Sequence, residues 1–145
     1  MTRTSSRQVL TVGLIAAAVS GVPSTLHALA TGRDPLEATA AAGSLLLPNE
    51  TDRRVLLAAA IPAHLAISVG WTGLLACALR GKRSVFRGTL YGVVIGLLDL
   101  QVVGRRFPRI AQLSIGPQLA DHALFGACVA ALLPDARERR RLPLA

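Results

Sequence analysis

Pro117-Gln118-Leu119-Ala120-Asp121-His122 places a carboxylate and an imidazole side by side within the last long apolar segment of the chain. That segment runs from about residue 110 to residue 133 and stops at Pro134. It is long enough to cross a bilayer as a helix. Ionisable side chains at membrane depth are costly, and most of them face the inside of a bundle or a water-filled cavity. The stretch therefore predicts a membrane-spanning helix with an inward polar face.

The composition of all 145 residues fits a membrane protein. Apolar residues make up 52% and charged residues 17%, which is more apolar and less charged than an ordinary soluble domain. The net charge of +8 comes from basic residues in short segments between long apolar runs. Such charge sets membrane topology and contacts anionic headgroups, and no nucleic-acid-binding module accompanies it. The expected partner is therefore the lipid bilayer and not a nucleic acid.

Three further apolar segments have the length of a span. Together with the last one, they cover about residues 8–30, 54–79, 85–103 and 110–133. Between the first two, Asp34, Pro35 and Glu37 form a helix-start pattern, and Pro48 ends the helix. A helix over about residues 35–47 is too short to span. We expect it to lie at the membrane interface or against the bundle, with a re-entrant element as the alternative.

The expected fold class is therefore all-α: a four-transmembrane-helix bundle with one short interfacial helix between spans one and two. Its length makes the chain, residues 1–145, a single integral membrane domain. Residues 135–145 form a polar, basic tail that either continues as a short helix or has no regular structure.

The first segment has a second interpretation, as a signal peptide. A basic start, an apolar core and Ala28-Leu29-Ala30 match a leader with its cleavage site. We favour a retained helix, because small and polar residues recur at three- and four-residue steps and keep one helix face toward partners. These residues are Gly13, Ala17, Ser20, Ser24, His27 and Thr31.

The basic residues also orient the chain. Four spans put both termini on one side, where the amino end, the 80–87 loop and the tail carry two, four and four basic residues; the other side carries six. The positive-inside rule then places both termini in the cytoplasm. Fifteen arginines against one lysine, together with the many alanines, suggest a GC-rich bacterial genome. The expected location is the bacterial inner (plasma) membrane, with a multi-pass topology.

Gly88, Gly92 and Gly96 repeat at four-residue spacing in the third segment. Small residues at this spacing let two membrane helices approach closely. Asp99 follows Gly96 by three residues, so it lies on the same helix face. We expect this face to pack against another helix, within the bundle or in a homo-oligomer, with Asp99 pointing inward.

Five ionisable residues form the expected polar intramembrane cluster: His27, His64, Asp99, Asp121 and His122. Counted from the outer ends, His27 and Asp99 lie about 5–7 Å deep and the other three about 15–18 Å deep. One interpretation is structural, with His64 bonded to Asp121 or His27 bonded to Asp99 at about 0.6–2 kcal/mol each. A proline shortly precedes each histidine, and the resulting kinks can open a small wet cavity to the outside.

Two functional interpretations use the same cluster. It can relay protons or line a path for a small solute or ion. Its imidazoles and carboxylates also suit a metal or haem, with His27, His64, His122 and Asp121 as candidates. No HExxH or other ligand-spaced pair stands on a single helix, and few aromatic residues are present to wall a haem pocket. No cofactor is therefore expected.

Nothing in the sequence predicts catalysis. There is no nucleophile elbow, phosphate-binding loop or dinucleotide-binding glycine pattern. Cys77 and Cys128 stand alone in apolar segments, which is typical of small packed side chains. The expectation is a protein that is not an enzyme.

Three stretches carry a family resemblance: Gly21-Val22-Pro23-Ser24-Thr25-Leu26-His27, Asp34-Pro35-Leu36-Glu37-Ala38-Thr39 and Gly116-Pro117-Gln118-Leu119-Ala120-Asp121-His122. With these, nearly the whole chain resembles a family of small four-span inner-membrane proteins of GC-rich bacteria. The resemblance implies an inner-membrane location and brings no activity, ligand or catalytic residue.

The sequence therefore leaves three hypotheses. The first is association or structural support, in a homo-oligomer or with another membrane protein. The second is a path for a small solute, a proton or an ion through the polar cluster. The third is a metal- or haem-binding membrane protein.

Overall fold

The structure is a computed structural model that describes residues 4–80 and 83–133. Within these ranges every regular element is a helix, and no strand occurs. The elements are α1 (Ser6–Ser20), α2 (Val22–Ala30), α3 (Glu37–Gly43), α4 (Arg53–Ala78), α5 (Val85–Leu98), the π-helix η1 (Asp99–Val103), the 3-10 helix η2 (Gly104–Arg106), α6 (Pro108–Ala111) and α7 (Ile115–Leu132). Arg3, Lys82 and the tail over residues 135–145 lie outside the described residues.

Four helical runs are long and apolar enough to cross a membrane. They are Ser6–Ala30, Arg53–Ala78, Val85–Arg106 and Ile115–Leu132. Many large apolar side chains on these runs are exposed, such as Leu29, Ile61 and Val102. Exposed apolar faces of this extent suit a lipid environment. The expectation of an all-helical chain with four candidate spans is therefore confirmed for the described residues.

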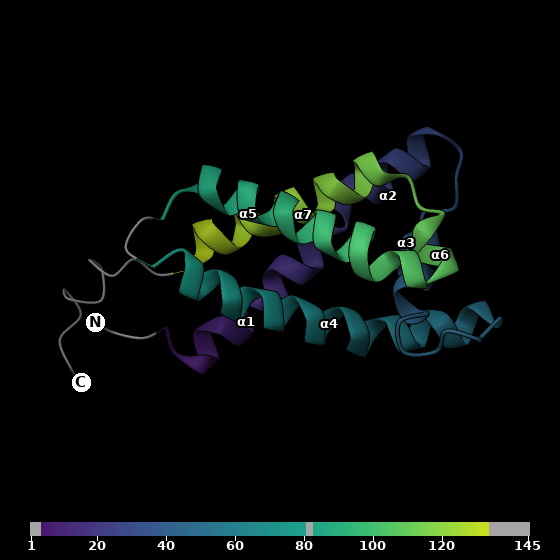
Figure 1. Ribbon diagram of the computed structural model, residues 1–145, viewed down its shortest axis with the longest axis horizontal. Coiled ribbons are helices and arrows are strands. Elements are labelled where there is room, and N and C mark those ends of the chain that lie inside the picture. The colour runs from purple at the N-terminus through teal and green to yellow at the C-terminus, as the bar shows by residue number, and fades with distance from the viewer. Residues whose placement is uncertain (1–3, 81–82, 134–145) are drawn as a thin grey trace.

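The four runs alternate in direction, as Figure 1 shows. α4 lies along one side, and α5 and α7 lie together along the other. The α1–α2 run passes diagonally between these two sides, with α1 against both α4 and α7 and α2 against α7. α4 has almost no contact with α5. One apolar core nevertheless includes residues of α1, α4, α5 and α7, such as Val12, Leu75, Ile95, Phe125 and Val129.

The short helix after the first run is shorter than the expected 35–47. Asp34 does not cap a helix that begins at Pro35; its Oδ1 accepts the Leu36 N–H and the Arg53 guanidinium, and a turn precedes α3. After Gly43 the chain tightens into turns that end at Leu47. Gly43 lies against α4, where an added Cβ would come 2.0 Å from the Leu56 carbonyl oxygen. This contact holds α3 against α4.

The third and fourth runs also end differently from the expected 85–103 and 110–133. α5 continues through η1 and η2, so helical structure extends past Val103 to Arg106. Residues 108–111 form the separate α6, and the last run starts only at Ile115. The residues between these two expected spans, 104–109, are thus largely helical, because the 3-10 helix η2 continues from η1 and α6 begins at Pro108.

The glycine-spaced face of α5 packs against α7. A Cβ on Gly88 would lie 2.3 Å from the Gly126 carbonyl oxygen, and one on Gly92 would lie 2.1 Å from the His122 carbonyl oxygen. A Cβ on Gly96 would lie 2.9 Å from the His122 side chain. Only glycine permits this backbone approach. Since α7 occupies the face within the same chain, it is not free for a second copy in this arrangement.

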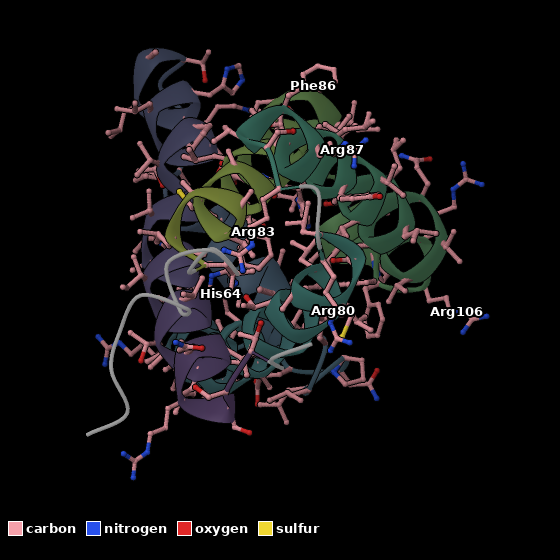
Figure 2. All side chains as sticks on the ribbon, turned by 90° about the vertical axis from the view of Figure 1, so that its left-hand side faces the viewer. His64, Arg80, Arg83, Phe86, Arg87 and Arg106 are labelled. Atoms are coloured by element: carbon pink, nitrogen blue, oxygen red, sulfur yellow. The ribbon has the colours of Figure 1, made fainter. Side chains whose placement is uncertain are left out.

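The end of the molecule near residues 80–87 is basic. Figure 2 faces this end and shows Arg80, Arg83, Phe86 and Arg87 around it. The Arg83 guanidinium donates to the Leu133 carbonyl at the carboxyl end of α7. A cation at this position satisfies a free carbonyl and complements the helix dipole.

We expect Gly92→Ala to destabilise the protein by about 1–3 kcal/mol, because the new methyl group meets the α7 backbone and cannot be accommodated by a side-chain rotation. Gly70→Ala is the matched control, since it also lies inside a helix and its Cβ would meet nothing within 4 Å. The control should match the unsubstituted protein or gain up to about 1 kcal/mol. Thermal unfolding in detergent measures both, and equal melting temperatures for the two variants would contradict the packing described.

Candidate functional site

A groove of about 680 Å³ lies between α4 and the α5–α7 pair. The region around Gly21, where α1 gives way to α2, forms part of its lining, and residues of α3 and α6 line it at one end. Its rim includes exposed apolar side chains such as Ile61, Ile67 and Leu74. Its polar lining consists of Ser20, Ser24, Thr25, Thr39, His64, Ser68, Trp71, Asp99, Gln118, Asp121 and His122. Four of the five residues of the predicted polar cluster therefore line one groove.

Two of these residues satisfy backbone groups at the break in the first run. Pro23 has no N–H that could donate to the Val19 carbonyl one turn earlier. The Gly21 N–H donates to the Val19 carbonyl instead, so it does not donate to the Ala17 carbonyl as it would in a continuous helix. The Ala17 carbonyl is left to side chains and accepts from His64 Nε2 at 3.1 Å. On the other side of the break, the Ser24 N–H donates to Asp121 Oδ1 at 2.8 Å. His64 therefore serves the end of α1, and Asp121 caps the start of α2.

A second group of polar residues joins three helical runs. Trp71 of α4 donates from Nε1 to Asp99 Oδ2 at 3.1 Å. His122 of α7 places Nε2 3.4 Å from the same oxygen, and its Nδ1 lies 2.8 Å from the Gln118 carbonyl. Asp99 opens the π-helix η1, a form of helix that is frequent at functional sites. The side chains of Asp99 and His122 remain 26% and 22% exposed, so the pair is reachable from the groove.

The Asp99–His122 contact can hold one proton. The Gln118 carbonyl can only accept, so His122 Nδ1 must donate to it. A hydrogen bond between Nε2 and Oδ2 then requires a hydrogen on one of them, because a neutral imidazole nitrogen and a carboxylate oxygen are both acceptors. Either His122 is an imidazolium beside a carboxylate, or Asp99 is a carboxylic acid beside a neutral imidazole. In both forms the pair has no net charge and holds a proton that can be exchanged.

The predicted pairs His64–Asp121 and His27–Asp99 are wrong. In the described part of the chain, Asp99 is bonded by Trp71 and His122, and Asp121 is bonded by Ser24. His27 is exposed and lines a separate pocket of about 160 Å³ with Arg33, Asp34 and Glu37. This loop-end pocket and the groove share five lining residues, Ser24, Pro35, Ala38, Leu113 and Gln118. The groove therefore adjoins a charged pocket at the loop end.

The histidines do not converge on a metal site. Their polar surroundings differ: His27 lies in the loop-end pocket, His64 bonds a backbone carbonyl, and His122 pairs with Asp99. Over residues 4–80 and 83–133, no three or more His, Cys, Asp or Glu side chains lie close enough to hold a metal ion. Cys77 and Cys128 are free thiols. The arrangement gives no support to the metal- or haem-binding hypothesis.

No protein-family model matches the chain. Searches of curated proteins and of solved structures give no match either.

Trp71 and Ser24 are the site residues that the polar-cluster argument missed. Trp71 is the single tryptophan of a chain with only 3% aromatic residues. A lone indole inside an apolar span is a signal, because its N–H needs a partner when it is buried. The Ser24 contribution comes from a backbone N–H, and the available signal was the nearby Gly21 and Pro23, which together break the helix.

Replacing Asp121 with alanine should free the start of α2 and cost about 0.5–2 kcal/mol, the usual range for a lost helix cap. Asp121→Asn is the matched control, because its amide oxygen can still accept the Ser24 N–H. Hydrogen exchange of the Ser24 and Thr25 amides should speed up in the alanine variant and stay near the original rate in the asparagine variant. Unchanged exchange in Asp121→Ala would show that the cap is not needed.

Proposed function

We propose that this chain is a multi-pass integral membrane protein that binds a small amphipathic molecule in the groove and links its movement to a proton. The single observation that carries the proposal is the meeting of Trp71, Asp99 and His122 in the wall of a 680 Å³ groove. The volume lies in the range of small-molecule sites, which are mostly apolar with a few placed polar groups. The exchangeable proton of the Asp99–His122 pair supplies the link.

We place the four runs across a bacterial inner membrane as a helix bundle, with both termini in the cytoplasm and α3 at the outer interface. Support comes from the alternation of the runs, since the described amino end, the end of α4 and the start of α5 lie at the same end of the molecule (Figure 1). That end carries Arg7, Arg80, Arg83 and Arg87. The opposite orientation would expose these residues outside, against the positive-inside rule. The groove then opens sideways toward lipid, and the loop-end pocket faces the outer side.

A purely structural role remains the second candidate, and one observation favours it. His64 and Asp121 are engaged by backbone groups at the helix break, so they act as helix caps and need no further function. This role does not account for Trp71, Asp99 and His122. None of these three side chains bonds the break, and they line an opening that helix packing alone does not require.

The fluorescence of Trp71 tests the groove directly, because it is the only tryptophan in the chain. In reconstituted protein, lipids with brominated tails should quench Trp71 strongly, while iodide in the water should quench it weakly. Trp71→Phe with Val94→Trp is the control, since Val94 is 46% exposed on α5 and its indole should face lipid. Quenching of Trp71 well below that of the control would show a groove closed to lipid and contradict the proposal.

A further inference from the structure

The ionisable side chains of the groove lining are acidic residues and histidines. They are Asp99 on η1, Asp121 and His122 on α7, and His64 on α4; α1, α2, α3, α5 and α6 contribute none. Among the described residues that line the groove there is no lysine and no arginine. The whole chain, in contrast, has 16 basic residues and eight acidic ones. The described lysines and arginines of this basic protein therefore do not line the groove.

The charge balance of the groove favours a cation. Asp121 contributes one negative charge, which the positive end of α2 offsets only in part. The Asp99–His122 pair is neutral while it holds its proton and becomes negative when the proton leaves. A positive charge in a site of low dielectric gains most beside such a group. An anion would meet Asp99 and Asp121 with no lysine or arginine in the described lining, and only the histidines there could carry a positive charge.

The rest of the lining suits a hydrophobic body. Apolar side chains such as Ile61, Leu74, Ile95 and Phe125 make up most of the walls. Trp71 supplies an indole next to Asp99, and an aromatic face attracts a cation that has lost its water. A small hydrated metal ion gains nothing from these walls, whereas an organic cation with an apolar body uses both parts of the groove.

We infer that the groove takes a lipophilic organic cation, and that the cation replaces the proton held between Asp99 and His122. This inference rests on the proposed function and names its ligand class. In the exchange, the cation lies beside the Asp99 carboxylate and His122 becomes neutral with its Nδ1–H still on the Gln118 carbonyl. The Nε2 proton passes to water. One positive charge enters as one leaves, so the charge of the site is conserved.

The experiment is equilibrium binding of tetraphenylphosphonium to the full-length protein in detergent, followed by Trp71 fluorescence. Tetraphenylborate is the matched anion of the same shape, and triphenylphosphine oxide is a neutral relative. Tetraphenylphosphonium should bind at least about tenfold more tightly than either. Its affinity should rise about tenfold per pH unit while the pair holds the proton, because each cation displaces one proton. Asp99→Asn should lower the affinity at least tenfold and remove the pH dependence.

Equal binding of the cation and the borate would overturn the inference, and so would cation binding that does not change with pH. Binding of the neutral probe alone would overturn it while leaving the proposed function in place. Failure of all three probes in a protein whose Trp71 is quenched by brominated lipid would also overturn it. A closed groove in the quenching experiment would instead remove the proposed function itself. If Asp99→Asn does not fold, as judged by thermal unfolding, the pH dependence of the unsubstituted protein still decides.

Discussion

The break between α1 and α2 imposes the constraint on which the arrangement depends. A backbone N–H or carbonyl without a partner in the membrane interior costs several kcal/mol. Gly21 and Pro23 create such groups, and His64 and Asp121 satisfy them from two other helices. α4 and α7 are therefore held to opposite sides of the α1–α2 run at defined rotations. Moving either helix by one residue would turn its capping side chain away from the break, because successive helix residues point about 100° apart.

The glycine face of α5 sets the second half of the architecture. Gly92 lies against the His122 backbone and Gly96 against the His122 side chain, so the close packing of α5 on α7 also positions the imidazole beside Asp99. The small-residue face of α5 packs against α7. No second such face of α5 packs against α4, and α4 and α5 make almost no contact. The groove lies in the space between α4 and the α5–α7 pair, where Trp71 of α4 donates to Asp99.

Much of this could be predicted from the sequence, but the polar pairing could not. The lengths of the apolar segments predicted the four candidate spans. The four-residue spacing of the glycines predicted a helix face that packs closely. Depth counting failed because it placed the ends of two runs at Val103 and Ile110, whereas they lie at Arg106 and Ile115. Asp99 and His122 are each seven residues from those ends, hence at equal depth. The π-helix and the 3-10 helix that shift the ends follow no periodicity in the sequence, and pairing across helices depends on rotations that only tertiary packing fixes.

The groove has two kinds of polar residue, which differ in whether their side chains can bind a ligand without disturbing the helix break. His64 and Asp121 are each engaged by a backbone group at the helix break; His64 shares the Ala17 carbonyl with the Ser20 hydroxyl, and Asp121 accepts the Ser24 N–H, so binding anything else there would disturb the break. Asp99 and His122 contact each other and can share a proton, and the Trp71 N–H donates to a carboxylate oxygen of Asp99. The side chains of Asp99 and His122 both remain partly exposed. Helix register alone could be fixed by a neutral, fully buried pair at lower desolvation cost. An ionisable pair that stays exposed to a groove with no lysine or arginine in its described lining costs more than apolar packing would, and it is suited to exchanging a proton for a cation.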